Sequence, residues 1–114
     1  MKTIVIADTD PHIRAMFKEL FNMHVVYIAC NGLAAINLVV DNSNVDLVII
    51  EADLPIVSGM MAYKSIRLRR PELFIVLMVN KTICIEDKFL YIIPKPIKEE
   101  VFYFLLQTFC KGFD

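Results

Sequence analysis

The stretch VDLVIIEADLPIVSG, residues 45–59, decides the fold of this chain. The uninterrupted apolar run Leu47–Ile50 predicts a strand buried on both faces, and Glu51 follows at its carboxyl end. Pro55 and Gly59 then mark a loop, after which a helix is expected. Ligands of open parallel sheets bind beyond the carboxyl ends of the strands. The sequence therefore places Glu51 where chemistry is expected.

Strand and helix patterns alternate along the whole chain. Strands are expected over 3–7, 24–29, 47–50, 73–79 and 89–93, and helices over 11–21, about 33–40, 59–70 and 99–110. Strands that are apolar on both faces and alternate with helices indicate a parallel sheet covered on both sides, a doubly wound α/β fold. Residues 81–88 are too few for a typical helix of about 11 residues and its two loops. The fourth helix is therefore expected to be shortened or absent.

Composition limits the class of protein. The 114 residues suit a single domain over 1–114, and 57% hydrophobic against 22% charged residues argues against disorder. A net charge of −1 gives no reason to expect nucleic-acid binding, and no apolar run approaches the roughly 20 residues of a membrane helix. Cys30, Cys84 and Cys110 lack metal-type spacing. We expect reduced thiols in a cytoplasmic protein, and no ligand role for His12 or His24.

Polar side chains follow four of the five expected strands. Because the carboxyl ends of parallel strands meet at one edge of a sheet, these side chains are expected to converge. The residues concerned are Asp8, Thr9 and Asp10 after the first strand, Glu51 after the third, Asn80 after the fourth and Lys95 after the fifth.

This arrangement resembles the receiver domain of bacterial response regulators over essentially the whole chain. The resemblance implies a five-stranded sheet in the order 2-1-3-4-5. It also implies an acidic metal-binding pair, an Asp that accepts a phosphoryl group four residues before Pro55, a Ser or Thr, and a Lys-Pro pair. Asp8 and Lys95 match the first acid and the lysine. Thr9 stands for the second acid, Glu51 for the acceptor and Asn80 for the hydroxyl residue. At the position of the aromatic switch residue stands Ile92, with Tyr91 one place away.

These replacements predict a degenerate receiver that is not phosphorylated, is not an enzyme, needs no cofactor and acts by protein contact. Glu51 is one methylene too long, and Thr9 removes a charge from a site where Mg²⁺ prefers carboxylate oxygens. Magnesium is expected to bind weakly at most, with Asp8 as the weak candidate ligand. Glu51 can instead pair with Lys95. That pair either locks the domain in one state or is a remnant without a signalling role, and both readings stay open.

Other readings of the acids are weaker. A receiver with an atypical phosphorylation site is the main alternative. Asp8 and Asp10 also resemble the nucleophile motif of haloacid-dehalogenase-type phosphatases, but no later acidic pair follows a strand. A flavodoxin-like protein must cradle a phosphate in its first loop, where these two acids would repel it. Asp53 lies two residues before Pro55 and is expected to be a loop carboxylate.

The terminal helix is apolar around most of its circumference. One stripe is expected to cover the sheet and consists of Val101, Phe104, Leu105 and Thr108. A second stripe, at spacings of four, three and four, consists of Phe102, Leu106, Phe109 and Phe113. Such a helix is buried on more than one side. The second stripe either fills the gap left by the short fourth helix or, as the resemblance favours, forms an interface with a like subunit or another protein, giving a homodimer.

Overall fold

The computed structural model describes residues 1–109, except the side chains of residues 105, 106, 108 and 109 near the end of the last helix. The strands are β1 (Thr3–Ala7), β2 (Val25–Ala29), β3 (Leu47–Glu51), β4 (Phe74–Val79) and β5 (Leu90–Pro94). The helices are α1 (Pro11–Leu20), α2 (Gly32–Asp41), α3 (Gly59–Arg69) and α4 (Glu99–Phe109). None of these helices is long and apolar enough to cross a membrane.

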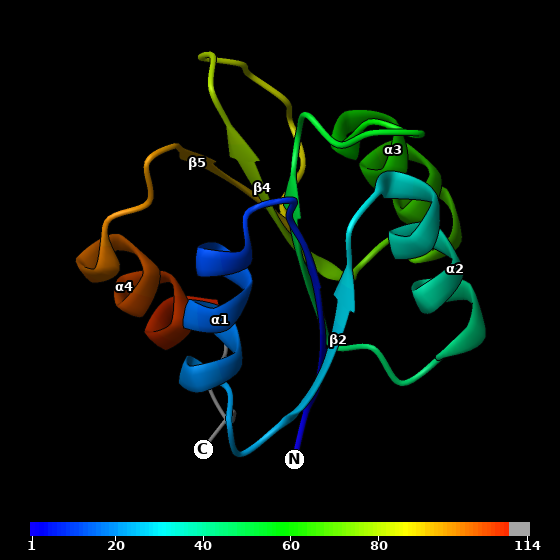
Figure 1. Ribbon diagram of the computed structural model, residues 1–114. Coiled ribbons are helices and arrows are strands. Elements are labelled where there is room, and N and C mark those ends of the chain that lie inside the picture. Colours follow the sequence, from blue (N-terminus) through cyan, green and yellow to red (C-terminus); the bar gives the residue numbers. More distant parts are fainter. Residues whose placement is uncertain (110–114) are drawn as a thin grey trace.

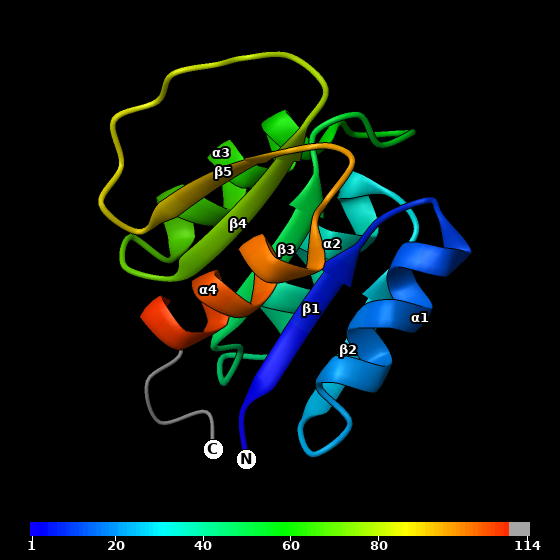
Figure 2. The same ribbon diagram turned by 90° about the vertical axis from the view of Figure 1, so that its left-hand side faces the viewer.

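All strand pairs are parallel, and the sheet order is β2-β1-β3-β4-β5. The predicted order is therefore confirmed. Helices α1 and α4 cover one face of the sheet, and α2 and α3 cover the other (Figures 1 and 2). Every residue of β1 and β3 is buried, as expected for central strands covered on both faces. The carboxyl ends of these two strands thus have fixed positions.

The core divides between the two faces of the sheet because successive strand residues point in opposite directions. Val5, Val48 and Leu77 lie in the cluster beneath α2 and α3. Ile6 and Ile49 lie in the other cluster, which α1 and α4 cover. Two buried faces explain why the strands read as continuous apolar runs rather than as alternating patterns.

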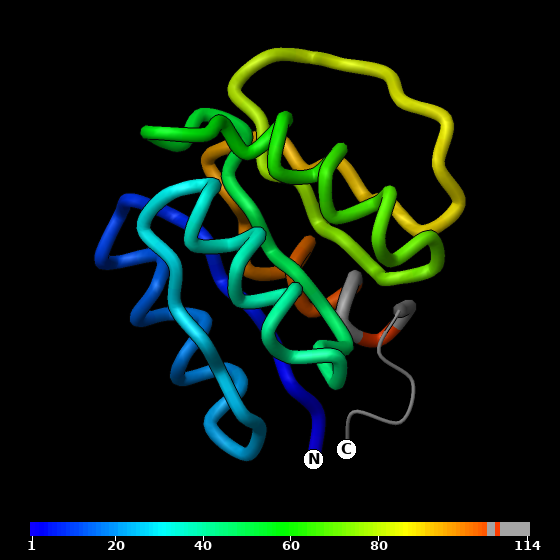
Figure 3. The backbone as a smooth tube through the Cα atoms, turned by 90° about the vertical axis from the view of Figure 1, so that its right-hand side faces the viewer, coloured from blue at the N-terminus to red at the C-terminus, as the bar shows by residue number. Residues whose placement is uncertain are grey.

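The chain between β4 and β5 forms no helix, which confirms the predicted loss of the fourth helix. It runs as an extended segment on the α3 side of the sheet (Figure 3). Asp87 ties this segment to α3: its Oδ2 accepts a hydrogen bond from the Tyr63 hydroxyl and lies 2.7 Å from Arg67 Nε. Ile83 and Ile85 pack against the core beside α3.

Candidate functional site

The site lies at the carboxyl end of β1, where Asp8 is fully buried. The Asp8 amide donates to the carbonyl of Ala29 at 3.2 Å, and its Oδ1 accepts from the Asp10 amide at 2.8 Å. Asp10 itself caps α1, since its Oδ1 accepts from the His12 amide at 2.8 Å and Pro11 begins the helix. Asp10 is thus committed to the helix end, whereas Asp8 faces the interior.

Glu51 comes from the end of β3 and is 8% exposed. Its Oε1 lies 2.9 Å from Lys95 Nζ. Its Oε2 accepts from both the amide and the hydroxyl of Thr9, at 3.3 and 3.2 Å. Both carboxylate oxygens therefore have donors, and one of those donors is a charged ammonium.

Lys95 follows β5, and its amide donates to the carbonyl of Val79 at 2.8 Å, which anchors the start of the Lys95–Pro96 turn to β4. Its Nζ also lies 3.2 Å from Asp8 Oδ2. The ammonium thus stands between two buried carboxylates. The structure contains the Glu51–Lys95 ion pair that the sequence suggested and adds Asp8 to it.

The pKa values of the two carboxyl groups in this cluster are shifted in opposite directions. Burial raises the pKa of Asp8, because the hydrogen bond from the Asp10 amide and the nearby Lys95 ammonium offset the lost hydration only in part. Burial also acts to raise the pKa of Glu51, but the hydrogen bonds from Lys95 and the Thr9 amide outweigh it and lower that pKa. The pKa of Lys95 is raised, since Glu51 and Asp8 together overcome the effect of burial. Glu51 is therefore the firmly ionised partner of Lys95, and Asp8 is the carboxyl more easily protonated.

The loop after β3 packs tightly behind Glu51. The Gly59 amide donates to the carbonyl of Ala52 at 2.8 Å, and a Cβ at Gly59 would come within 1.6 Å of the Glu51 carbonyl oxygen. Only glycine fits there, eight residues after Glu51. Ile56, at the tip of the loop, has a φ of 71° and is 77% exposed, a strained conformation for a β-branched residue.

Asn80 does not join the cluster, contrary to the expected convergence of four strand ends. Its Nδ2 donates to Asp53 Oδ2 at 3.2 Å, and both residues are exposed. This pair lines a small cavity of about 210 Å³ together with Ser58 and Ile83. Asp53 is a loop carboxylate, as predicted. Its contact with Asn80 could not be predicted from the sequence, because it depends on the conformations of the loops after β3 and β4.

Tyr91 and Ile92, the candidates for the switch position, point to opposite faces of β5. Tyr91 packs in the cluster on the α1 and α4 side, and Ile92 packs in the cluster on the α2 and α3 side. Both are partly buried. Ile92 therefore contributes apolar packing at the position where an aromatic residue was expected.

Three side chains of α4 are placed differently from the prediction. Phe102, assigned to the interface stripe, is 2% exposed, and its ring lies 4.5 Å from that of Phe17 and 5.8 Å from that of Phe21. Val101 and Phe104, expected to cover the sheet, are 39% and 65% exposed. Phe17 of α1 and Phe21, the residue that caps the end of α1, both pack against the ring of Phe102, which explains why this side chain is buried. The side chains of Leu106 and Phe109, as well as Phe113, lie outside the described residues.

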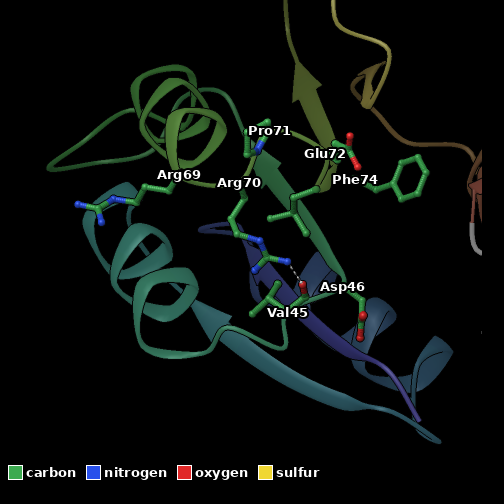
Figure 4. Close-up of a pocket in the computed structure, with 8 residues that line it drawn as sticks. Val45, Asp46, Arg69, Arg70, Pro71, Glu72 and Phe74 are labelled. Atoms are coloured by element: carbon green, nitrogen blue, oxygen red, sulfur yellow. Dashed lines mark hydrogen bonds between the residues drawn. The ribbon is translucent and has the colours of Figure 1, made fainter.

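A larger cavity, of about 600 Å³, opens at the opposite end of the sheet (Figure 4). Its lining includes Asp46, Arg69, Arg70 and Glu72. Arg70 spans part of it and donates from Nη2 to the Val45 carbonyl at 2.8 Å. No residue of the polar cluster at the carboxyl end lines this cavity.

The described residues contain no group of three or more His, Cys, Asp or Glu side chains able to hold a metal ion. Asp8 Oδ2 is buried and accepts no hydrogen bond, but the Lys95 ammonium already faces it. The Thr9 hydroxyl is turned to Glu51 as a donor. The oxygen donors thus do not fit a divalent cation in this arrangement.

Comparison with known proteins identifies the class. Residues 4–105 match the profile of the response regulator receiver domain, and the chain belongs to that family. It is accordingly a module of two-component phosphorelay signalling. Among curated proteins, no sequence matches the chain.

Solved structures share the fold at low identity. The signal receiver domain of an HD domain-containing protein from Pseudomonas fluorescens Pf-5 has a TM-score of 0.82 and 20% identity, covering 98% of this chain and 96% of its own. A receiver domain protein from Clostridium thermocellum gives 0.81 and 17%, covering 95% and 93%. The regulator TrrA from Thermotoga maritima, solved with Mg²⁺ and BeF, gives 0.74 and 24%, covering 94% and 98%.

Proposed function

We propose that this chain is a receiver-type signalling module that does not accept a phosphoryl group and acts through protein contact rather than as an enzyme. The observation that carries the proposal is the position of the Lys95 ammonium, 2.9 Å from Glu51 and 3.2 Å from Asp8. Each carboxylate of the cluster thus faces the same ammonium without a metal or a phosphate.

The first support is the reach of Glu51. Phosphoryl transfer depends on in-line positioning of the attacking oxygen, and a misplacement of about 1 Å can cost roughly a hundredfold in rate. Glutamate carries its carboxylate one carbon–carbon bond, about 1.5 Å, further than aspartate. Attack would also require Glu51 to leave Lys95 or Thr9, which hold both of its oxygens.

The second support concerns magnesium. Mg²⁺ requires near-ideal octahedral oxygen coordination and is usually held by one or two carboxylates. Here Thr9 offers a hydroxyl where a second acid is expected, and the free oxygen of Asp8 faces an ammonium that repels a second cation. We propose that Mg²⁺ binds at most weakly and that no other cofactor is required.

The Glu51–Lys95 ion pair also suggests how the conformation of the module is controlled. Lys95 joins the end of β5 to the ends of β1 and β3 through Asp8 and Glu51. We propose that this bridge holds the domain in one state. In the Glu51→Gln variant, we expect faster amide hydrogen exchange around Lys95. A role as a mere remnant predicts wild-type exchange in this variant.

Partners are expected to be proteins. Val101, Tyr103 and Phe104 on α4 are exposed apolar side chains, and Phe104 alone is 65% exposed. Such side chains in one helix are typical of an interaction surface. We propose that a protein partner or a like subunit, in a homodimer, binds on this side. TrrA, a structural relative, has been solved in complex with the histidine kinase ThkA. The proposed location is the cytoplasm, where the free thiols of Cys30 and Cys84 would stay reduced.

A magnesium and beryllofluoride titration, followed by NMR of the labelled protein, tests the inert site. We expect no saturable shift of the Thr9 and Glu51 amides at millimolar Mg²⁺. The matched control is the double variant Thr9→Asp, Glu51→Asp, which restores an acidic pair and a short acceptor and should respond. Saturable shifts in the wild type would favour an active receiver with an atypical site. A phosphatase role is disfavoured, because Asp10 is engaged as a helix cap.

A further inference from the structure

The segment that replaces the missing helix has the side-chain pattern of a strand. From residue 82 to residue 86 burial alternates: Ile83 and Ile85 are half-buried against the core, whereas Thr82, Cys84 and Glu86 are exposed. This period of two is that of an extended chain with one covered face. Isoleucine and threonine also favour strands.

The backbone of this segment has no partner in the described part of the chain. Residues 81–86 make no backbone hydrogen bond to any described residue, although β4 and β5 on either side pair with each other. The segment runs along the outside of the molecule beside α3 (Figure 3). Unpaired N–H and C=O groups on an extended chain form a template for another strand.

Contacts at both ends hold the segment in place. Asn80 donates to Asp53 at 3.2 Å before it, and Asp87 binds Tyr63 and Arg67 after it. Burial acts to raise the pKa of Asp87, but its hydrogen bonds from Tyr63, the Phe89 amide and Arg67 lower it, so the anchor is ionised at neutral pH. A strand fixed in this way loses little conformational entropy on pairing.

We propose that residues 81–87 pair with the same segment of a second copy as an antiparallel two-stranded ribbon centred on Cys84. The proposal is independent of whether Glu51 accepts a phosphoryl group. It also leaves the exposed surface of α4 free for a different partner.

The register follows from the residues. Covered faces match only when residues of the same parity lie opposite each other, which allows centres at Ile83, Cys84 or Ile85. A centre at Ile83 sets Lys81 opposite Ile85, and a centre at Ile85 sets Asp87 opposite Ile83. Both place a charge against an apolar side chain.

The centre at Cys84 gives complementary pairs throughout. It sets Ile83 opposite Ile85 and places no charge against an apolar side chain, since Lys81 lies opposite Asp87, whose carboxylate already binds Arg67. The exposed Thr82 and Glu86 then face each other, and Cys84 faces its own copy on the twofold axis. This register sets apolar opposite apolar and polar opposite polar side chains along both strands, which indicates a second copy of this chain as the occupant.

Sedimentation equilibrium under reducing conditions tests the pairing, and substitutions of the exposed Cys84 do not disturb the core. Cys84→Lys sets two like charges directly opposite each other and should raise the dimer dissociation constant about tenfold or more. Cys84→Thr, the matched control, suits a strand and should leave the constant within about twofold of wild type. A wild type that stays monomeric up to several hundred micromolar, or a Cys84→Lys variant that associates like wild type, would overturn the proposal.

Disulfide trapping tests the register separately. In a chain whose only cysteine is Cys84, diamide should cross-link two copies, accepting the two protons and two electrons released by the thiols. In a Cys84→Ser background, a chain whose only cysteine comes from Thr82→Cys should cross-link slowly with itself. A mixture of that chain with one whose only cysteine comes from Glu86→Cys should cross-link rapidly. Cross-linking through Cys84 no faster than through Cys30 alone would contradict the proposed register.

Discussion

Replacing Lys95 with methionine removes the ammonium and keeps most of the side-chain volume. Asp8, fully buried, and Glu51, 8% exposed, would then face each other without a cation. Removing one partner of a buried ion pair costs about 3–5 kcal/mol. Because the Lys95 side chain is 17% exposed, we expect the lower end, about 3 kcal/mol at pH 7.5. For a chain of 114 residues this corresponds to a drop in Tm of roughly 12 °C.

The cost should depend on pH. In the wild type the lowered pKa of Glu51 contributes stability above its unfolded value, and this is lost as the pH falls through the folded pKa. Without Lys95, burial dominates and both carboxyl pKa values lie above their unfolded values. Their stability is then present below the unfolded pKa and is lost as the pH rises. The variant should therefore recover about 1–2 kcal/mol relative to wild type between pH 7.5 and pH 5.

Urea unfolding at the two pH values measures both effects, with unchanged m values as the check on two-state behaviour. The matched control is Lys98→Met, which removes the same charge from an exposed position three residues away. Lys98→Met should cost less than about 0.5 kcal/mol. If Lys95→Met costs no more than Lys98→Met, or if its cost is the same at both pH values, the account of the buried cluster is refuted.

Three further predictions concern single side chains. Thr9→Val removes the hydroxyl that donates to Glu51 at 3.2 Å and should cost about 1 kcal/mol in urea unfolding; a neutral effect would contradict the hydrogen bond. Ile56→Asn relieves a φ of 71° at an exposed residue and should stabilise the fold by about 1 kcal/mol, seen as a higher Tm and contradicted by a lower one. Asp87→Asn weakens the link to Arg67 and should cost about 1–2 kcal/mol at neutral pH. Because the folded pKa of Asp87 is lowered, the difference from wild type should vanish in acid, and a constant difference would contradict the assignment.

The positions of the strands and helices were predictable because burial on two faces leaves long apolar runs, whereas the strand order followed from the resemblance to receiver domains. The third strand was predicted over 47–50 and lies at Leu47–Glu51. The loss of the fourth helix was predicted because only eight residues, 81–88, were available for it. Asp10 and Pro11 likewise predicted the start of α1. These features depend on local pattern and length, which the sequence displays directly.

Side-chain partners across loops were less predictable. Glu51 and Lys95 were paired because opposite charges were expected to meet at the carboxyl edge of the sheet, but the contact of Asp8 with the same ammonium needs coordinates. Asn80 turns to Asp53, a choice that loop geometry makes. Phe102, Val101 and Phe104 were assigned to the wrong faces of α4, because a helix apolar all around offers no unique stripe. Phe102 is buried because its ring packs against Phe17 and Phe21, and no spacing within α4 reveals these contacts.

The central claim is that the Glu51 pocket cannot take a phosphoryl group. Incubation with acetyl phosphate and Mg²⁺, followed by intact-mass analysis, tests it most directly, with the Thr9→Asp, Glu51→Asp double variant as the control for restored chemistry. We expect wild-type protein of unchanged mass under conditions in which the double variant gains a hydroxylamine-labile phosphoryl group. A stoichiometric phosphoryl adduct that maps to Glu51 in the wild type would contradict the account.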